Sequence, residues 1–185
     1  MRVIAGSAKG IRLQAVPGSG TRPISDRVKG AVFDILGETV IESYVLDLFA
    51  GTGSVGIEAL SRGAEQAVLV DKHHKAIAAI RTNLLRTQLQ ARARVVKADV
   101  FKFLTGDPQP FDMIYVAPPQ YRGLWKKTLL ALEANPLWLA PDGVAIVQIF
   151  PKEMEPLTLS TLRLSEQRKY GSTLLCFYEP VTQNP

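Results

Sequence analysis

The pattern of apolar and polar residues changes at about residue 44. Beyond it, short apolar runs alternate with segments in which apolar residues recur every three or four positions, the period of a helix. The apolar runs predict strands over 44–49, 66–71, 93–99, 111–117 and 143–150. Five apolar strands separated by helices predict a parallel sheet that helices cover on both faces.

The segments between these strands predict helices over 54–63, 73–87, 100–104 and 125–134. The longest of them carries an apolar side made of Ile77, Ile80, Leu84 and Leu85. The chain closes with two segments of alternating polarity, 162–171 and 172–180, which predict an antiparallel hairpin at one edge of the sheet. The predicted fold class is therefore α/β, with a doubly wound, mostly parallel, seven-stranded sheet.

The segment before residue 44 has a different pattern of apolar and polar residues. Residues 1–24 predict a short β-hairpin and a loop, and Ser25 is placed to cap a helix that begins at Asp26. The apolar face of that helix is predicted from Val28, Val32, Ile35 and Leu36. We therefore divide the chain into a basic N-terminal extension, 1–40, and a main domain, 41–185.

The positive charge of the chain is concentrated in this extension. The formal net charge is +5, and residues 1–30 hold six basic residues and one acid. The remaining residues are balanced, so the whole excess belongs to the first thirty positions. A basic segment on a neutral body favours an arm that faces phosphate groups, although a contribution to solubility alone is the simpler alternative.

Composition excludes several classes of protein. The single cysteine, Cys176, lies in an apolar run and cannot form an internal disulfide, which favours a cytoplasmic location. His73 and His74 lack cysteine partners at zinc spacing, so we read them as the start of a helix and expect no metal. We also expect neither a secretory signal nor a membrane span.

The first candidate site is a glycine loop after the first strand. Gly51, Gly53 and Gly56 follow the pattern G-x-G-x-x-G, and Asp71 stands at the end of the second strand. A nicotinamide dinucleotide would fit this pattern, which by itself is weak evidence because glycines also serve strand-to-helix turns. That alternative predicts an oxidoreductase.

Two further acids favour another cofactor. Asp47 lies within the end of the first strand, where a carboxylate is poorly placed beside a pyrophosphate but could receive a cation or hold the loop's amides. Asp99 closes the third strand and could accept from an adenine amino group. Three acids at successive strand ends suit S-adenosylmethionine, which carries an ammonium and a sulfonium but no phosphate. The alternative for Asp71 and Asp99 is that each only caps the next helix.

A proline corner follows the fourth strand, at residues 117–121, Ala-Pro-Pro-Gln-Tyr. Prolines fix φ and lack amide hydrogens, so the carbonyls of Ala117 and Pro118 could be held rigidly outward. Such acceptors could bind an exocyclic amino group of a nucleobase, and Tyr121 could stack on the base. The simpler alternative is that the two prolines only end the strand.

With these motifs, the chain resembles the bacterial 16S ribosomal RNA guanine-N2 methyltransferases of the RsmD type, within the class I S-adenosylmethionine-dependent enzymes. The resemblance covers nearly the whole chain. It includes TRPISDRVKGAVFDIL directly before VLDLFAGTGSVGIEALSRGA, and continues through VLVDK, VKADV, FDMIYV and KYGSTLL. The glycine loop alone is shared by all class I methyltransferases, which have a Rossmann-like fold.

The resemblance implies roles for three groups of residues. The cofactor would lie against Asp47, Phe49, Ala50, Gly51, Thr52, Gly53, Asp71, Lys72, Asp99 and Val100. The ribosomal RNA would contact Arg2, Lys9, Arg12, Arg22, Arg27, Lys29 and Arg122. The catalytic corner would be Ala117, Pro118, Pro119, Gln120 and Tyr121.

The resemblance also exposes a departure. The family's corner is usually Asp-Pro-Pro followed by an aromatic residue, whereas here Ala117 replaces the acid and Gln120 replaces the aromatic residue. The favoured function is methylation of a guanine N2 amine in 16S RNA, within a small-subunit or assembly particle. The alternative is an RNA- or ribosome-binding protein with a degenerate methyltransferase site. The oligomeric state is not predicted, although a monomer is slightly favoured.

Overall fold

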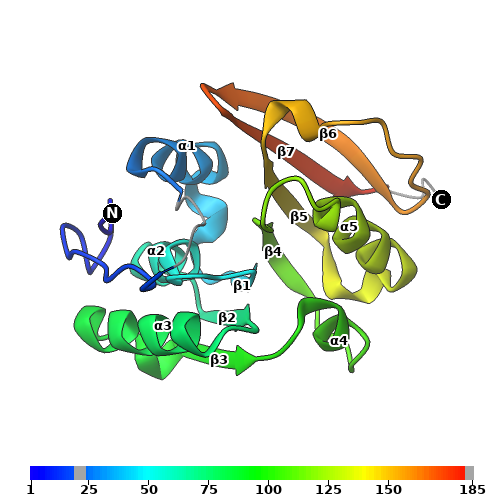
Figure 1. Cartoon of the computed structure of the whole chain (residues 1–185). Coiled ribbons are helices and arrows are strands. Elements are labelled where there is room, and N and C mark those ends of the chain that lie inside the picture. Colours follow the sequence, from blue (N-terminus) through cyan, green and yellow to red (C-terminus); the bar gives the residue numbers. More distant parts are fainter. Residues whose placement is uncertain (19–23, 182–185) are drawn as a thin grey trace.

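A computed structural model describes residues 1–18 and 24–181, and these form an open, seven-stranded sheet with helices on both faces (Figure 1). The strands are β1 (Tyr44–Leu48), β2 (Gln66–Asp71), β3 (Ala93–Lys97), β4 (Phe111–Val116), β5 (Leu139–Ile149), β6 (Leu162–Tyr170) and β7 (Thr173–Pro180). They follow the order β3-β2-β1-β4-β5-β7-β6. The doubly wound, mostly parallel sheet predicted from the sequence is confirmed.

Strand order reverses at β1, which has β2 on one side and β4 on the other. All pairings among the first five strands are parallel, and β7 pairs antiparallel with both β5 and β6. Leu48 pairs with Val70 and with Val116, so β1, β2 and β4 end side by side. Ligands of open α/β sheets bind beside the carboxyl ends at such a reversal.

Two groups of helices cover the sheet. The α-helices are α1 (Asp26–Leu36), α2 (Ser54–Ser61), α3 (His74–Thr87), α4 (Val100–Leu104) and α5 (Leu124–Ala134), and the 3₁₀ turns are η1 (Gly37–Val40), η2 (Gln90–Arg92), η3 (Pro136–Trp138) and η4 (Pro151–Glu153). The apolar side chains of α1, α2 and α3 share one buried cluster with one face of the sheet, and those of α4 and α5 share a second cluster with the other face.

The α1 helix begins where the sequence predicts. The Ser25 hydroxyl accepts a hydrogen bond from the Val28 N–H at 3.2 Å, which caps the first turn. The prediction of the apolar face of α1 is partly wrong, because Ile35 is exposed while Phe33 is buried. Leu85 is likewise exposed in α3. Each residue lies at one edge of its predicted apolar stripe, and the buried face of each helix is centred on other positions.

Within residues 1–18, the N-terminal extension turns back on itself, and backbone hydrogen bonds join its two arms without forming regular strands. Arg2 and Arg12 make a single antiparallel bridge, because side chains of α2 satisfy much of the neighbouring backbone. The Glu58 carboxylate accepts from the N–H groups of Ile4 and Ala5, and the Ser61 hydroxyl accepts from that of Ala8. The extension is therefore packed on the helical layer rather than paired as a separate sheet.

The remaining structural expectations concern histidines, cysteine and membranes. His73 and His74 begin α3, as predicted, and Cys176 is buried in β7. In the described ranges, 1–18 and 24–181, no helix is long and apolar enough to cross a membrane.

Candidate active site

The glycine loop joins the end of β1 to the start of α2. Phe49, Gly51 and Gly53 all have positive φ, at 62°, 57° and 77°. The Ala50 N–H donates to the Val70 carbonyl at 2.9 Å, and the Gly53 N–H donates back to the Ala50 carbonyl at 2.7 Å. The loop is thus a tight turn anchored to the end of β2 at the carboxyl edge of the sheet, where Phe49 and Gly51 are half-buried.

Asp47 lies beneath this loop and is buried. Its Oδ2 accepts from the Gly56 N–H at 3.0 Å, so it holds an amide of the glycine motif, one of the two roles considered from the sequence. Burial raises the pKa of the Asp47 carboxyl to about 8, the Gly56 hydrogen bond opposes this rise, and the charge of Asp71 adds to it. No hydrogen bond reaches Oδ1 from the described part of the chain.

Asp71 connects the glycine loop to α3. Its Oδ2 accepts from the Gly51 N–H at 3.0 Å, and its Oδ1 accepts from the His73 N–H at 2.9 Å. The carboxylate therefore supports the turn at the start of α3, as the alternative interpretation of this residue predicted, and also holds the loop. Both features place Asp71 at the strand end beside Gly51.

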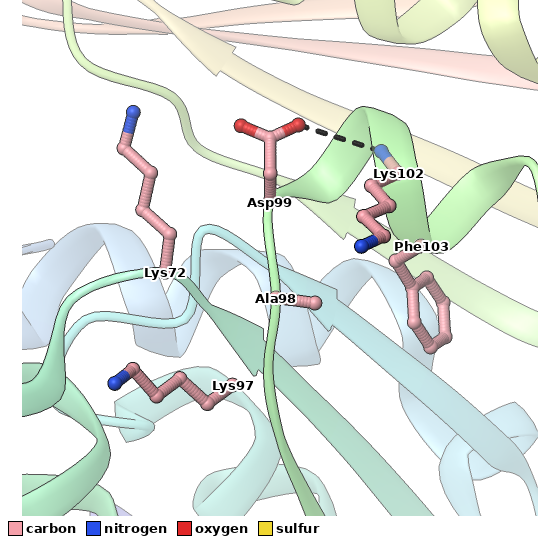
Figure 2. Close-up of a pocket in the computed structure, with 6 residues that line it drawn as sticks. All are labelled: Lys72, Lys97, Ala98, Asp99, Lys102 and Phe103. Carbon is pink, nitrogen blue, oxygen red and sulfur yellow. Dashed lines mark hydrogen bonds between the residues drawn. The ribbon is translucent and has the colours of Figure 1, made fainter.

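A third part of the edge is a hollow of about 500 Å³ around Asp99, lined by Lys72, Lys97, Ala98, Asp99, Lys102 and Phe103 (Figure 2). Asp99 caps α4, because its Oδ1 accepts from the N–H groups of Phe101 and Lys102 at 3.0 and 3.4 Å. In Figure 2 the Asp99 carboxylate and the Lys72 ammonium extend in the same direction from adjacent strand ends. The cap uses one carboxylate oxygen and leaves the other toward solvent.

The proline corner follows β4 at the same edge. Pro118 is buried, whereas Gln120 is exposed and Tyr121 is 65% exposed. Tyr121 has a φ of 57°, which is unusual for a residue with a side chain. Its N–H donates to Glu153 Oε1 at 2.6 Å, and its ring lies 5.7 Å from that of Phe150 at an interplanar angle of 48°. The corner therefore presents an exposed aromatic ring on a constrained backbone.

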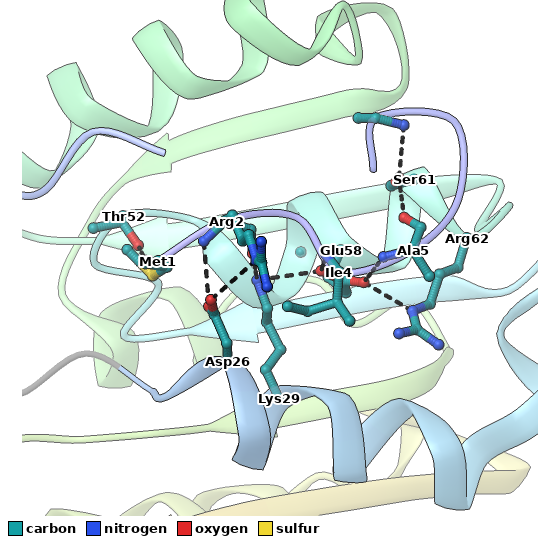
Figure 3. A network of polar contacts seen from close by, with 12 residues as sticks. Met1, Arg2, Ile4, Ala5, Asp26, Lys29, Thr52, Glu58, Ser61 and Arg62 are labelled. Carbon is teal, nitrogen blue, oxygen red and sulfur yellow. Dashed lines mark hydrogen bonds and ion pairs between the residues drawn. The ribbon is translucent and has the colours of Figure 1, made fainter. Parts of the chain in front are cut away.

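The basic residues expected to contact RNA do not all lie on the surface. Arg2, Lys9, Arg12, Arg27 and Arg122 are exposed, and Arg22 lies outside the described residues. The expectation for Lys29 is wrong. Its ammonium is fully buried, 3.2 Å from Glu58 Oε2, and donates to the Arg2 carbonyl at 2.7 Å (Figure 3). A buried ion pair cannot contact a phosphate, so Lys29 has a structural role.

Two buried polar residues that sequence reasoning missed organise this region. Glu58 accepts from the backbone of the extension and from Arg62 as well as pairing with Lys29. Asn83 on α3 donates to the carbonyls of Thr52 and Gln14 and accepts from the Gln14 N–H, which ties the glycine loop to the extension. A lone acid in the apolar segment SVGIEALS was the available signal for Glu58.

Comparison with known proteins decides the family. The family model described as Conserved hypothetical protein 95 matches residues 1–179. The chain belongs to this family.

The relatives of this family member confirm the resemblance that was inferred from its sequence. The chain is 38% identical over 183 residues to YlbH of Bacillus subtilis, covering 97% of this chain and 98% of the relative. It is 31% identical over 183 residues to ribosomal RNA small subunit methyltransferase D of Escherichia coli K12, covering 99% of this chain and 91% of the relative. The solved structure of yhhF from Escherichia coli covers 99% of both chains with a TM-score of 0.88 and 31% identity.

Proposed function

We propose that this family member is an S-adenosylmethionine-dependent methyltransferase that methylates the exocyclic N2 amine of a guanine in 16S ribosomal RNA. The observation that carries the proposal is the meeting of the glycine loop and the proline corner at one edge of the sheet, where β1 and β4 end side by side. Relatives at 31–38% identity over almost the whole chain support the reaction class and the RNA substrate.

The residues at this edge fit the cofactor. We assign the methionine part to the loop from Asp47 to Gly53, the ribose hydroxyls to Asp71, and the adenine to Asp99 and Val100 beside Lys72. The fit rests on the buried Asp47 carboxylate, which has an oxygen free of described partners, and on the hollow at Asp99. When bound, the cofactor supplies an electrophilic methyl group on its sulfonium.

The proline corner would hold the amine that is methylated. The lone pair of a guanine N2 is delocalised into the ring, so the protein must align it and accept its hydrogen bonds as positive charge develops. Without the usual acid, those acceptors would be the backbone carbonyls of Ala117 and Pro118 and the Gln120 amide oxygen. Pro119 restrains the turn, and Tyr121 offers a stacking surface for the base.

Cofactor binding is expected to depend on pH through Asp47. Because burial raises the pKa of this carboxyl to about 8, the free protein carries it neutral at pH 7, and the stability that the neutral form contributes is lost as the pH rises from about 4 to about 8. The cofactor's ammonium favours the ionised form, so affinity for S-adenosylhomocysteine should rise roughly tenfold between about pH 6.5 and 8.5. Calorimetry across this range measures it.

Asp47→Asn is the matched control for this pH dependence. The asparagine side-chain oxygen still accepts from the Gly56 N–H, but the residue no longer ionises. The variant should bind S-adenosylhomocysteine more weakly at high pH and show little change with pH. A pH dependence equal to that of the unchanged protein would contradict the assignment of Asp47 to the cofactor site.

The alternative function rests on the departure at Ala117. A degenerate site predicts normal, salt-sensitive RNA binding without methyl transfer, and it predicts that Ala117→Asp creates activity. We favour an active enzyme, because the other parts of the site are present in this chain. Transfer of labelled methyl groups from S-adenosylmethionine to unmodified small-subunit RNA or particles separates the two. Transfer by the unchanged protein supports the proposal, and transfer by Ala117→Asp alone supports the alternative.

The exposed arginines and lysines of the extension support ribosomal RNA as the partner, free or within an assembling small subunit. Such a substrate also implies a cytoplasmic location. A nicotinamide oxidoreductase, considered on the glycine motif alone, predicts NAD binding. Calorimetry with NAD and with S-adenosylhomocysteine tests it, and we expect heat only from the second.

A further inference from the structure

Tyr121 is held in a backbone conformation that residues with a side chain rarely adopt. A φ of 57° places a residue with a side chain in the left-handed region, where its Cβ crowds the neighbouring backbone. Such strain persists only where the surrounding structure holds it, and it occurs often at functional sites. The Tyr121 ring nevertheless stays mostly exposed, so burial of the ring is not what holds the backbone.

The group that holds it is Glu153, a residue of η4 that lies 32 positions away in the chain. Glu153 Oε1 accepts from the Tyr121 N–H at 2.6 Å, and Oε2 accepts from the Phe150 N–H at 3.2 Å. One carboxylate therefore bridges the corner after β4 and the end of β5. These strands are neighbours in the sheet, which brings the two segments together.

The bridge also sets the two aromatic rings against each other. The Phe150 ring, half-buried, contacts Tyr121 at a centroid distance of 5.7 Å, an ordinary separation for a tilted aromatic pair. Phe150 thus supports one side of Tyr121 and leaves much of the ring accessible. An accessible ring fixed in this way is suited to stack on a planar base.

We propose that Glu153 is a positioning residue that holds Tyr121, supported by Phe150, as the stacking surface for the target base. This inference rests on the proposed function and extends it to residues outside the glycine loop and the proline corner. Glu153 acts through the Tyr121 backbone and does not touch the base or the cofactor. Removing the Glu153 carboxylate should therefore impair only the stacking of the base on Tyr121.

A double-mutant cycle tests this inference. Glu153→Ala and Tyr121→Ala should each lower kcat/KM for RNA methylation by roughly 10- to 100-fold, the factor that corresponds to losing base stacking. The double variant should be no worse than Tyr121→Ala alone, because both changes remove the same contact. Glu153→Gln keeps one carbonyl acceptor and should fall between Glu153→Ala and the unchanged protein.

Glu155→Ala is the matched control. Glu155 lies two residues away, is exposed, and pairs with Lys126 on α5, so its loss should leave kcat/KM unchanged. Affinity for S-adenosylhomocysteine should stay within twofold in all variants. Additive losses in the double variant, or a loss of cofactor affinity in Glu153→Ala, would overturn the inference.

A second readout does not require methyl transfer. Single-stranded RNA that contains 2-aminopurine loses fluorescence when the base stacks on an aromatic ring. The unchanged protein should quench it, and Glu153→Ala and Tyr121→Ala should lose the quenching to the same extent. Absence of methylation with this pattern intact would count against the proposed reaction alone. Quenching that survives Glu153→Ala but not Tyr121→Ala would overturn the role of Glu153.

Discussion

Replacing Glu58 with alanine is expected to lower the free energy of unfolding by about 3–5 kcal/mol, the scale of breaking a buried ion pair from one side. Glu58 and Lys29 are both fully buried, with Oε2 and Nζ 3.2 Å apart. Burial lowers the pKa of the Lys29 ammonium, and the Glu58 carboxylate opposes that shift. Without Glu58, the Lys29 ammonium loses its counter-charge and keeps the Arg2 carbonyl as an acceptor, while the N–H groups of Ile4 and Ala5 lose the carboxylate that accepts from them. Urea unfolding at neutral pH measures the change.

The control for this prediction is an acid in an exposed ion pair. Glu179 pairs with Arg163 at 3.1 Å, and their side chains are 43% and 63% exposed. Glu179→Ala should change the free energy of unfolding by no more than about 1 kcal/mol. Equal losses for Glu58→Ala and Glu179→Ala would contradict the role given to the buried network.

The Glu58 network also links stability to the proposed RNA surface. It holds the segment that carries Arg2, Lys9 and Arg12 against α2, and Lys29 itself bonds to the Arg2 carbonyl. Loosening this segment should therefore weaken RNA binding even where the main sheet stays folded. If the exposed basic residues contact RNA as proposed, the buried lysine contributes by positioning them.

Replacing Gly53 with valine is expected to lower the affinity for S-adenosylhomocysteine by roughly 100-fold, or about 2–3 kcal/mol. Gly53 has a φ of 77°, which a β-branched residue adopts only under strain. An added Cβ would lie 3.0 Å from Leu69 Cδ2 and 3.3 Å from Ile80 Cγ1, so these two side chains would have to give way while the loop backbone is strained. Because the loop backbone is the proposed binding surface, calorimetry should detect the loss directly.

A second glycine separates backbone strain from damage to the site. Gly171 lies in the turn between β6 and β7 with a φ of 59°, and an added Cβ there meets no atom within 4 Å. Gly171→Val should cost some stability without altering cofactor affinity. Thermal unfolding of both variants shows that binding is compared between folded proteins. Unchanged affinity in folded Gly53→Val would contradict the placement of the cofactor on this loop.

The sheet was predictable because its signal is repeated along the chain. Buried parallel strands read as apolar runs, and segments such as Gln66–Asp71 end at turns and caps with strong local preferences. The buried faces of the helices were less predictable, as Ile35 and Leu85 illustrate, because an apolar residue at the edge of a predicted stripe can face either the core or the solvent. The predicted hairpin of the extension is reduced to a single bridge, because part of its backbone donates to acceptors on α2 that no local pattern reveals.

The residues of the candidate site likewise fall into those that a local pattern predicts and those that depend on distant partners. The loop and the acids at strand ends have local signatures. Asp47 holds a loop amide, which was one of its two expected roles, whereas the bond of Asp71 to Gly51 was not expected from the sequence. Lys29 could not be assigned correctly, since its partner Glu58 is 29 positions away. Glu153 was missed for the same reason, because its role depends on the adjacency of β4 and β5.

On the proposed function, a guanine amine and a methyl donor meet at the carboxyl edge of this sheet. Incubation of unmodified small-subunit particles with labelled S-adenosylmethionine, followed by mass spectrometry of the digested nucleosides, tests it most directly. We expect labelled N2-methylguanosine with the unchanged protein and a strong loss of label with Gly53→Val. No labelled nucleoside under conditions in which the Escherichia coli methyltransferase D is active, or label on another atom or base, would contradict it.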